Sequence, residues 1–97
     1  MASDKAYLQF VLDQLSGMDG IRSRAMMGEY ILYYQGKVFG GIYDNRLLIK
    51  PTASAKRLMP DAPQEIPYPG AKAMLLAEDI ENRSLWESLL PAMLTEL

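Results

Sequence analysis

The chain has 97 residues, of which 49% are hydrophobic, and its 12 acidic and 10 basic residues give a formal net charge of -2. It contains no cysteine and no histidine, which excludes disulfides, thiolate chemistry and the usual general base near neutral pH. An acidic chain has no overall attraction for phosphate backbones, so direct DNA binding is disfavoured. The length predicts one domain over residues 1–97.

Nothing in the sequence suggests a membrane segment or a bound metal. No stretch approaches the roughly 20 apolar residues that are needed to span a bilayer. The first ten residues, MASDKAYLQF, are too polar for a signal peptide. We therefore expect a cytoplasmic protein without a membrane partner. Because the commonest metal-ligating side chains are missing, we expect no cofactor and no metal.

An amphipathic helix is predicted near the start of the chain. Apolar residues recur at helical spacing at Leu8, Val11, Leu12 and Leu15. Ser3 stands where its hydroxyl can cap the helix, and Gly17 is a natural end point. This helix should pack its apolar side against the rest of the protein.

Four strands joined by short turns are predicted after this helix. Their approximate ranges are 22–27, 30–34, 37–43 and 46–50. The turns fall at Gly28-Glu29, Gln35-Gly36 and Asp44-Asn45, which are typical turn residues. Pro51 ends the last strand because proline cannot continue the hydrogen-bonded ladder. Connections this short imply antiparallel pairing.

The second half of the chain predicts a short helix, a stiff connection and one more strand. Thr52 can cap a helix over residues 53–59. Four prolines between residues 60 and 69 favour an extended segment on the surface, with Gly70 supplying a special backbone angle. The apolar run 73–77 has the length of a strand and should join the sheet.

The C-terminal segment predicts a helix with a broad apolar stripe. The stripe consists of Leu85, Trp86, Leu89, Leu90, Met93, Leu94 and Leu97. Asp79 or Asn82 can cap the helix, and Pro91 predicts a kink or a second short helix.

The width of this stripe allows two interpretations. Trp86, Leu90 and Leu94 could form an interface with a partner or with a second copy. The alternative, which we favour, is a final helix that is fully buried against the sheet.

These elements predict an α+β fold. It would have an antiparallel meander sheet of about five strands, an N-terminal helix, a short middle helix and a C-terminal helix. Four methionines lie in apolar patterns and are predicted to fill the core: Met26, Met59, Met74 and Met93.

The order and spacing of several residues also resemble a known family. They are Arg22, Arg24, Met26, Gly28, Glu29, Tyr33, Gly36, Phe39, Gly40, Leu47, Lys50 and Pro51, with Tyr68, Pro69 and Gly70 further along. This pattern resembles the N-terminal domain of the TfoX/Sxy competence regulators. Two positions depart from the family, since Met27 stands where phenylalanine is usual and Ile31 where glycine is frequent.

The resemblance carries implications for both fold and function. It implies an architecture similar to that of type III secretion chaperones. It also implies a role in the transcription of DNA-uptake genes, through contact with a cyclic-AMP-responsive transcription activator. Fold alone does not establish function, so the second implication is an analogy.

The same region contains a candidate binding face. Its residues are Arg22, Arg24, Glu29, Tyr30, Tyr33, Lys37, Tyr43 and Lys50. Basic side chains could bind an anion and tyrosine rings could stack on a ligand. The alternative, which we favour, is a solvated strand surface that discourages edge pairing. Glu29 lacks a second carboxylate or a histidine for acid–base catalysis, so we interpret it as a turn residue or an ion-pair partner of Arg24.

We expect a non-enzymatic regulatory module that acts through protein contacts. A homodimer that binds partner segments, as a chaperone does, is the first alternative. A small-molecule enzyme using tyrosine, glutamate and lysine side chains ranks last, because it would need a deep pocket with several ionisable groups facing inward.

Overall fold

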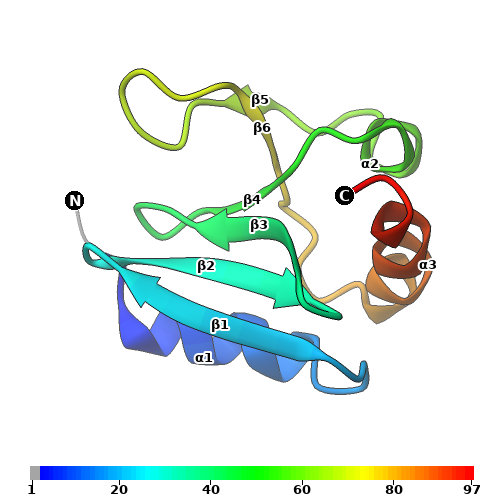
Figure 1. Ribbon diagram of the computed structural model, residues 1–97, viewed down its shortest axis with the longest axis horizontal. Helices are drawn as coiled ribbons and strands as arrows, with labels where there is room; N and C mark the ends of the chain where they lie inside the picture. Colours follow the sequence, from blue (N-terminus) through cyan, green and yellow to red (C-terminus); the bar gives the residue numbers. More distant parts are fainter. Residues whose placement is uncertain (1–2) are drawn as a thin grey trace.

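The computed structural model describes residues 3–97 and shows an α+β fold, as predicted (Figure 1). Over this range the elements run in the order α1 (Lys5–Gln14), β1 (Ile21–Met26), β2 (Glu29–Tyr34), β3 (Lys37–Ile42), β4 (Leu47–Ile49), α2 (Ala53–Leu58), β5 (Gln64–Glu65), β6 (Met74–Leu76) and α3 (Arg83–Leu94). Each predicted helix and strand is present within a few residues of its expected bounds. The short strand β5 was not predicted.

Within residues 3–97 the strands form one six-stranded antiparallel sheet with the order β1-β2-β3-β4-β6-β5. The first four strands are a meander, because each pairs with the next along the chain. The chain then leaves the sheet to form α2, and β6 returns to pair with β4. The short β5 lies outside β6 at the far edge.

Two-residue turns join the strands of the meander. Both central residues of each turn have positive φ: Met27 and Gly28, Gln35 and Gly36, Asp44 and Asn45. This conformation is that of the type I′ turn, whose twist matches the twist of the paired strands. The last two turns are therefore confirmed at their predicted positions, and the first lies one residue earlier than predicted.

A β-bulge interrupts the pairing of β3 with β2. Leu32 pairs with Gly40 and Tyr33 pairs with Val38, so Phe39 has no partner on β2. A bulge of this kind re-aims a side chain and increases the local twist. Phe39 is fully buried as a result.

Helices α1, α2 and α3 all pack against the same face of the sheet. Val11 of α1, Ala55 of α2 and Leu89 of α3 belong to one apolar cluster with Leu47 and Ile49 of β4. Figure 1 shows α1 running along β1 and β2. Helices α2 and α3 lie side by side at the right of the view, beyond the end of β2 that its arrowhead marks. The opposite face, which we call the open face, carries no helix of the described chain.

The apolar stripe of α3 is buried. Trp86 is 1% exposed, its Nε1 donates a hydrogen bond of 2.8 Å to the carbonyl oxygen of Ile80, and Leu90 is 0% exposed. Leu94 is half-buried against the same core. Trp86 and Leu90 are thus core residues and do not lie on a surface that a partner could reach. Pro91 lies on the exposed side of the helix, and α3 continues through it. Of the two alternatives predicted there, a kink or a second short helix, the second helix is wrong.

Two further predictions are corrected at the other end of the molecule. Ser3 does not cap α1, because Asp4 occupies the N-cap position and the Ser3 hydroxyl donates instead to Glu29 Oε1 at 2.6 Å. Met26 is 43% exposed, so it does not fill the core. It lies at the end of β1, an edge strand in which only Ile21 is partly covered.

Candidate binding groove

The open face begins at β1 and extends across the sheet. Arg22 pairs with Tyr33 and Arg24 pairs with Ile31, so these four side chains share one face. Leu48 lies on the same face further along, because its neighbours in β4 point to the core. Leu48 is nevertheless 0% exposed. The part of the open face around β4 is therefore covered by other parts of the chain.

A groove with a volume of about 540 Å³ lies over this part of the open face. The strands and the segment before α2 contribute Val38, Gly40, Tyr43, Lys50, Pro51 and Thr52. The connection between β5 and β6 contributes Pro67, Tyr68, Ala71, Lys72 and Ala73, followed by Met74 at the start of β6. Glu96 closes the lining from the C-terminal side. The groove thus brings together segments that are far apart in the sequence.

Two tyrosines form one end of the groove. The ring centroids of Tyr43 and Tyr68 are 6.0 Å apart at an interplanar angle of 52°, a tilted aromatic pair. Tyr43 packs over Gly41, where a Cβ atom would lie 2.6 Å from the Tyr43 ring. Burial raises the pKa of the Tyr43 hydroxyl, and Tyr68 and Glu29 raise it further. Tyr43 is therefore a hydrogen-bond donor near neutral pH and not a base.

The charges in the groove are two lysines and one glutamate. Both carboxylate oxygens of Glu96 accept hydrogen bonds from Ser54, at 3.1 Å from its backbone N–H and 2.8 Å from its hydroxyl. These bonds lower the pKa of Glu96. Lys50 and Lys72 have no ion-pair partner in residues 3–97, where the recorded ion pair joins Arg46 and Glu65 at 2.6 Å.

The loop that carries Tyr68 is held at its base by Arg46. The guanidinium of Arg46 binds Glu65 and also donates to the carbonyl oxygens of Ile66 and Pro67, at 3.3 and 3.5 Å. Pro67 is buried, whereas Tyr68 is 54% exposed. Arg46 is thus a structural anchor for the wall of the groove.

Glu29 has a structural role at the edge of the open face. Its Oε1 accepts a bond from the Ser3 hydroxyl, and its Oε2 accepts a bond of 3.0 Å from the backbone N–H of Asp44. Glu29 therefore links the N-terminal segment to the β3–β4 turn. It is not recorded in an ion pair with Arg24 within the described chain.

The structure brings together only part of the predicted binding face. Arg22, Arg24, Glu29, Tyr33 and Tyr43 lie on the open face, and Lys50 lines the groove. β1 and β4 are separated by three strand spacings, or about 14 Å, so the two arginines and Lys50 do not form one cluster.

The two remaining residues of the predicted face lie elsewhere. Tyr30 is half-buried against the core, on the side of the helices. Lys37 lies near the C-terminus, where its Nζ donates to the carbonyl oxygen of Leu97 at 3.4 Å.

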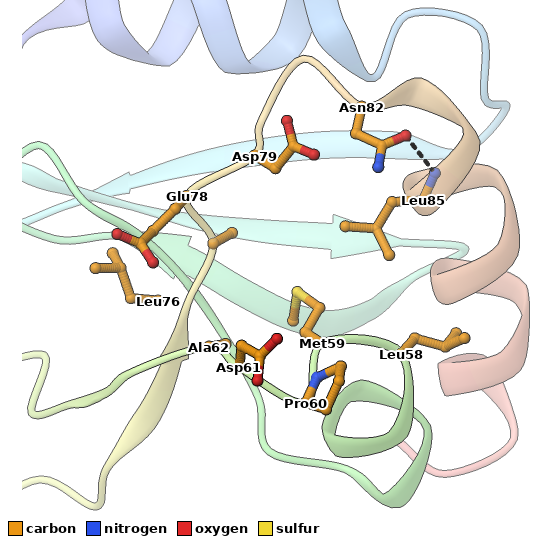
Figure 2. Close-up of a pocket in the computed structure, with 11 residues that line it drawn as sticks. Leu58, Met59, Pro60, Asp61, Ala62, Leu76, Glu78, Asp79, Asn82 and Leu85 are labelled. Carbon is orange, nitrogen blue, oxygen red and sulfur yellow. Dashed lines mark hydrogen bonds between the residues drawn. The ribbon is translucent and has the colours of Figure 1, made fainter.

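A second pocket of about 270 Å³ lies between the end of α2 and the segment that precedes α3 (Figure 2). It contains Asp61, Glu78 and Asp79, but Figure 2 shows that their carboxylates do not converge on one point. Within residues 3–97 no group of acidic residues is arranged to hold a metal ion. The acidic residues of this pocket are therefore not arranged as a metal site or as a pair of catalytic carboxylates.

Of the residues that line the groove, only Tyr43 and Lys50 were predicted as site residues. The others include the aromatic, charged and thioether side chains of Tyr68, Lys72, Met74 and Glu96. For Tyr68 the segment IPYPG offered one signal, because proline-rich segments can dock on aromatic grooves, but a tyrosine that pins its own loop to the body was the favoured interpretation. Met74 was predicted to fill the core, but it lies opposite the core-facing Leu75 and lines the groove. The run 73–77 is apolar throughout, so its sequence does not indicate which face each side chain takes. Lys72 and Glu96 carry no local signal.

No helix in the range 3–97 has the length and apolar character that crossing a bilayer requires.

Over residues 3–97 the chain is a small α+β domain with an open sheet face beside a groove. Residues 13–86 match the TfoX N-terminal domain, and the chain belongs to this family.

The chain is 41% identical over 80 residues to a protein of Spirochaeta aurantia that is described as an uncharacterized 12.7 kDa protein in the trpE 5′ region. The aligned part is 82% of this chain and 70% of that protein. No solved structure matches the chain.

Proposed function

We propose that this chain is a regulatory protein-interaction module, which acts in the transcription of competence genes by binding a partner protein and not by catalysis. Membership of the TfoX N-terminal domain family supports the biological setting. The observation that carries the proposal is the groove on the open face, where two tyrosines and two lysines surround an apolar surface. Partner surfaces commonly combine aromatic anchors with a charged rim.

The chemistry of the groove supports binding over catalysis. An acid–base or nucleophilic site needs a group that can change its protonation state near neutral pH. Tyr43 has a raised pKa, and both oxygens of Glu96 are occupied by Ser54. The sequence supplies no histidine and no cysteine. The groove lysines are the remaining candidates for such a group, but no hydrogen-bond or ion-pair partner that would activate either lysine is recorded beside them within residues 3–97.

The distribution of positive charge favours a protein partner over DNA. Arg22 and Arg24 lie on the edge strand, Lys50 and Lys72 lie at the groove, and Arg46 is paired with Glu65. A DNA-binding surface normally concentrates its basic residues in one continuous patch, since each phosphate contact adds to affinity. The net charge of -2 works against such a surface.

The edge strand β1 favours a second candidate function, a homodimer that binds partner segments. β1 pairs with β2 on one side only, and Met26 and the turn residue Met27 are 43% and 96% exposed. A free edge of this length is a template for pairing with another chain. Arg22 and Arg24 oppose that outcome, because charged side chains protect an edge.

A binding titration between purified proteins tests the proposal. The chain and the cyclic-AMP-responsive transcription activator from the same cell would be mixed and followed by isothermal calorimetry. We expect a complex at micromolar concentrations. Absence of detectable binding at those concentrations would contradict the proposal. Sedimentation of the chain alone separates the second candidate, because a strictly monomeric mass would exclude a homodimer.

A charge-reversal pair shows how far the binding surface extends. Arg22→Glu with Arg24→Glu should leave folding nearly unchanged, because both side chains are exposed on the edge strand. If the surface reaches β1, activator binding is lost in this variant. If binding depends on the groove alone, it is retained.

A further inference from the structure

We infer that the groove binds an extended acidic segment of the partner protein, with one large apolar side chain beside Tyr68 and carboxylates near Lys50 and Lys72. This inference rests on the proposed function and specifies the chemistry of the partner. It follows from the charge, the shape and the rigidity of the groove.

The groove is locally positive in an acidic protein. Lys50 follows β4 and Lys72 precedes β6, and both are exposed. Neither ammonium group donates a recorded hydrogen bond or ion pair within residues 3–97. The carboxylate of Glu96 has both oxygens bound by Ser54 and forms no recorded ion pair with either lysine, so the two ammonium groups outnumber the one carboxylate of the lining. A partner with negative charge therefore complements this surface.

The surface between the lysines is apolar and aromatic. Val38 and Met74 line it together with the rings of Tyr43 and Tyr68. Tyr68 is 54% exposed, so covering its ring would remove a large apolar area from water. The flexible thioether of Met74 can adapt to the shape of an inserted side chain. One large apolar side chain is the group that this surface would accept.

The wall that carries Tyr68 is already ordered before any partner binds. Arg46 holds the carbonyl oxygens of Ile66 and Pro67, and the backbone N–H of Ala71 donates to the carbonyl oxygen of Tyr68 at 3.1 Å. Pro67 and Pro69 restrict the backbone on both sides of Tyr68. A wall that does not need to be ordered lowers the entropic cost of binding.

A protein segment fits this groove better than a small polar molecule. Small-molecule sites use a few convergent polar groups to fix the ligand. In the part of the chain that the structure describes, no buried side-chain donor or acceptor is left without a partner. The polar groups of the groove are instead the exposed ends of lysines at its rim, which suit the side chains of a segment lying along the sheet.

Three synthetic peptides test the inference with the whole chain. The first has the sequence Gly-Asp-Glu-Phe-Asp-Glu-Gly, the second replaces its acidic residues with lysine, and the third replaces its phenylalanine with alanine. Binding would be measured by fluorescence anisotropy with a dye at the peptide N-terminus. We expect the first peptide to bind at least about tenfold more tightly than either control, with an affinity that falls as salt is added.

A matched pair of variants locates the binding site. Lys50→Glu with Lys72→Glu should weaken binding of the first peptide by at least about tenfold. Lys5→Glu with Lys56→Glu makes the same change in net charge at exposed positions on α1 and α2, outside the groove, and should weaken it by less than about threefold. Circular dichroism would verify that both variants are folded.

The outcomes separate this inference from the proposed function. Equal binding of the acidic and lysine peptides, an equal effect of the two variants, or no peptide binding would overturn the inference. If the activator still binds in that case, the proposed function stands and only the partner chemistry is wrong. If the acidic peptide binds as expected but the activator does not, the groove chemistry stands and the proposed function fails.

Discussion

The carboxylate of Glu96 receives two hydrogen bonds from Ser54, which joins the end of the described chain to the first turn of α2. The first backbone N–H groups of a helix have no partner within the helix. Glu96 satisfies the N–H of Ser54, and the Thr52 hydroxyl accepts the N–H of Ala55 at 3.1 Å. The predicted Thr52 cap is thus confirmed. Since Thr52 and Glu96 also line the groove, this contact fixes one of its ends.

The Glu96–Ser54 contact predicts a pH-dependent stability. Hydrogen bonds from Ser54 lower the pKa of Glu96 from its usual 4.5, so the folded protein binds this proton less readily than the unfolded chain. The stability that this contact contributes is fully present above the pKa of Glu96 in the unfolded chain. It is lost as the pH falls through the lower pKa of Glu96 in the folded protein. Glu96→Gln should reduce the free energy of unfolding at neutral pH, and the difference from the unmodified protein should shrink in acid.

Urea denaturation from about pH 7 to about pH 3 measures this difference. Glu87→Gln is the control, because Glu87 is exposed on α3 without a recorded hydrogen bond. Equal stability of both variants and the unmodified protein at neutral pH would show that the contact contributes nothing.

Gly40 allows β3 and β4 to approach closely, which predicts a large cost for any side chain there. A Cβ atom would collide with the carbonyl oxygen of Leu48 and lie 3.2 Å from the Cα of Ile49. Because these are backbone atoms, the strand itself would have to move. Gly40→Ala should lower the free energy of unfolding by about 2–4 kcal/mol.

Gly17→Ala is the matched control for this substitution. No atom lies within 4 Å of a Cβ atom built at Gly17. Gly17→Ala should therefore change the free energy of unfolding by less than about 1 kcal/mol, and we expect the change to be stabilising. Urea denaturation measures the free energy of unfolding of both variants. If Gly40→Ala changes it as little as Gly17→Ala does, the close approach of β3 and β4 at Gly40 would be refuted.

Trp86 is the one tryptophan in the sequence, so its fluorescence reports directly on the buried face of α3. At 1% exposure, its emission should be blue-shifted and protected from iodide in the folded protein. Trp86→Phe removes the hydrogen bond to Ile80 and leaves a cavity, which should cost about 2–4 kcal/mol in urea denaturation. Emission and quenching like those of free N-acetyltryptophanamide would instead place Trp86 on the surface.

The local features of the fold could be predicted from the sequence. Gln35-Gly36 and Asp44-Asn45 are turn residues by their own conformational preferences, and Pro51 stops a strand by lacking an N–H group. Features that depend on contacts between residues far apart in the sequence could not be predicted in this way. Ser3 looked like a helix cap, but its hydroxyl is bound by Glu29, 26 positions away. Met26 follows the apolar pattern, yet it lies on an edge strand.

The groove was less predictable than the fold. Tyr43 and Lys50 were expected to belong to a binding face, and both line the groove. Lys72 and Glu96 come from segments that only the folded topology brings beside them. The two residues of β5 likewise form a strand because β6 lies next to them, and nothing in the sequence of Gln64 and Glu65 marks a strand.

Photo-crosslinking to the transcription activator tests the central claim, that the groove on the open face binds the partner. Benzoylphenylalanine would replace Tyr68 in the groove or, in a matched variant, Phe10 on α1, which is 37% exposed on the helix side of the sheet. We predict a crosslinked complex from position 68 and none from position 10. Crosslinking from position 10 with none from position 68 would contradict the claim.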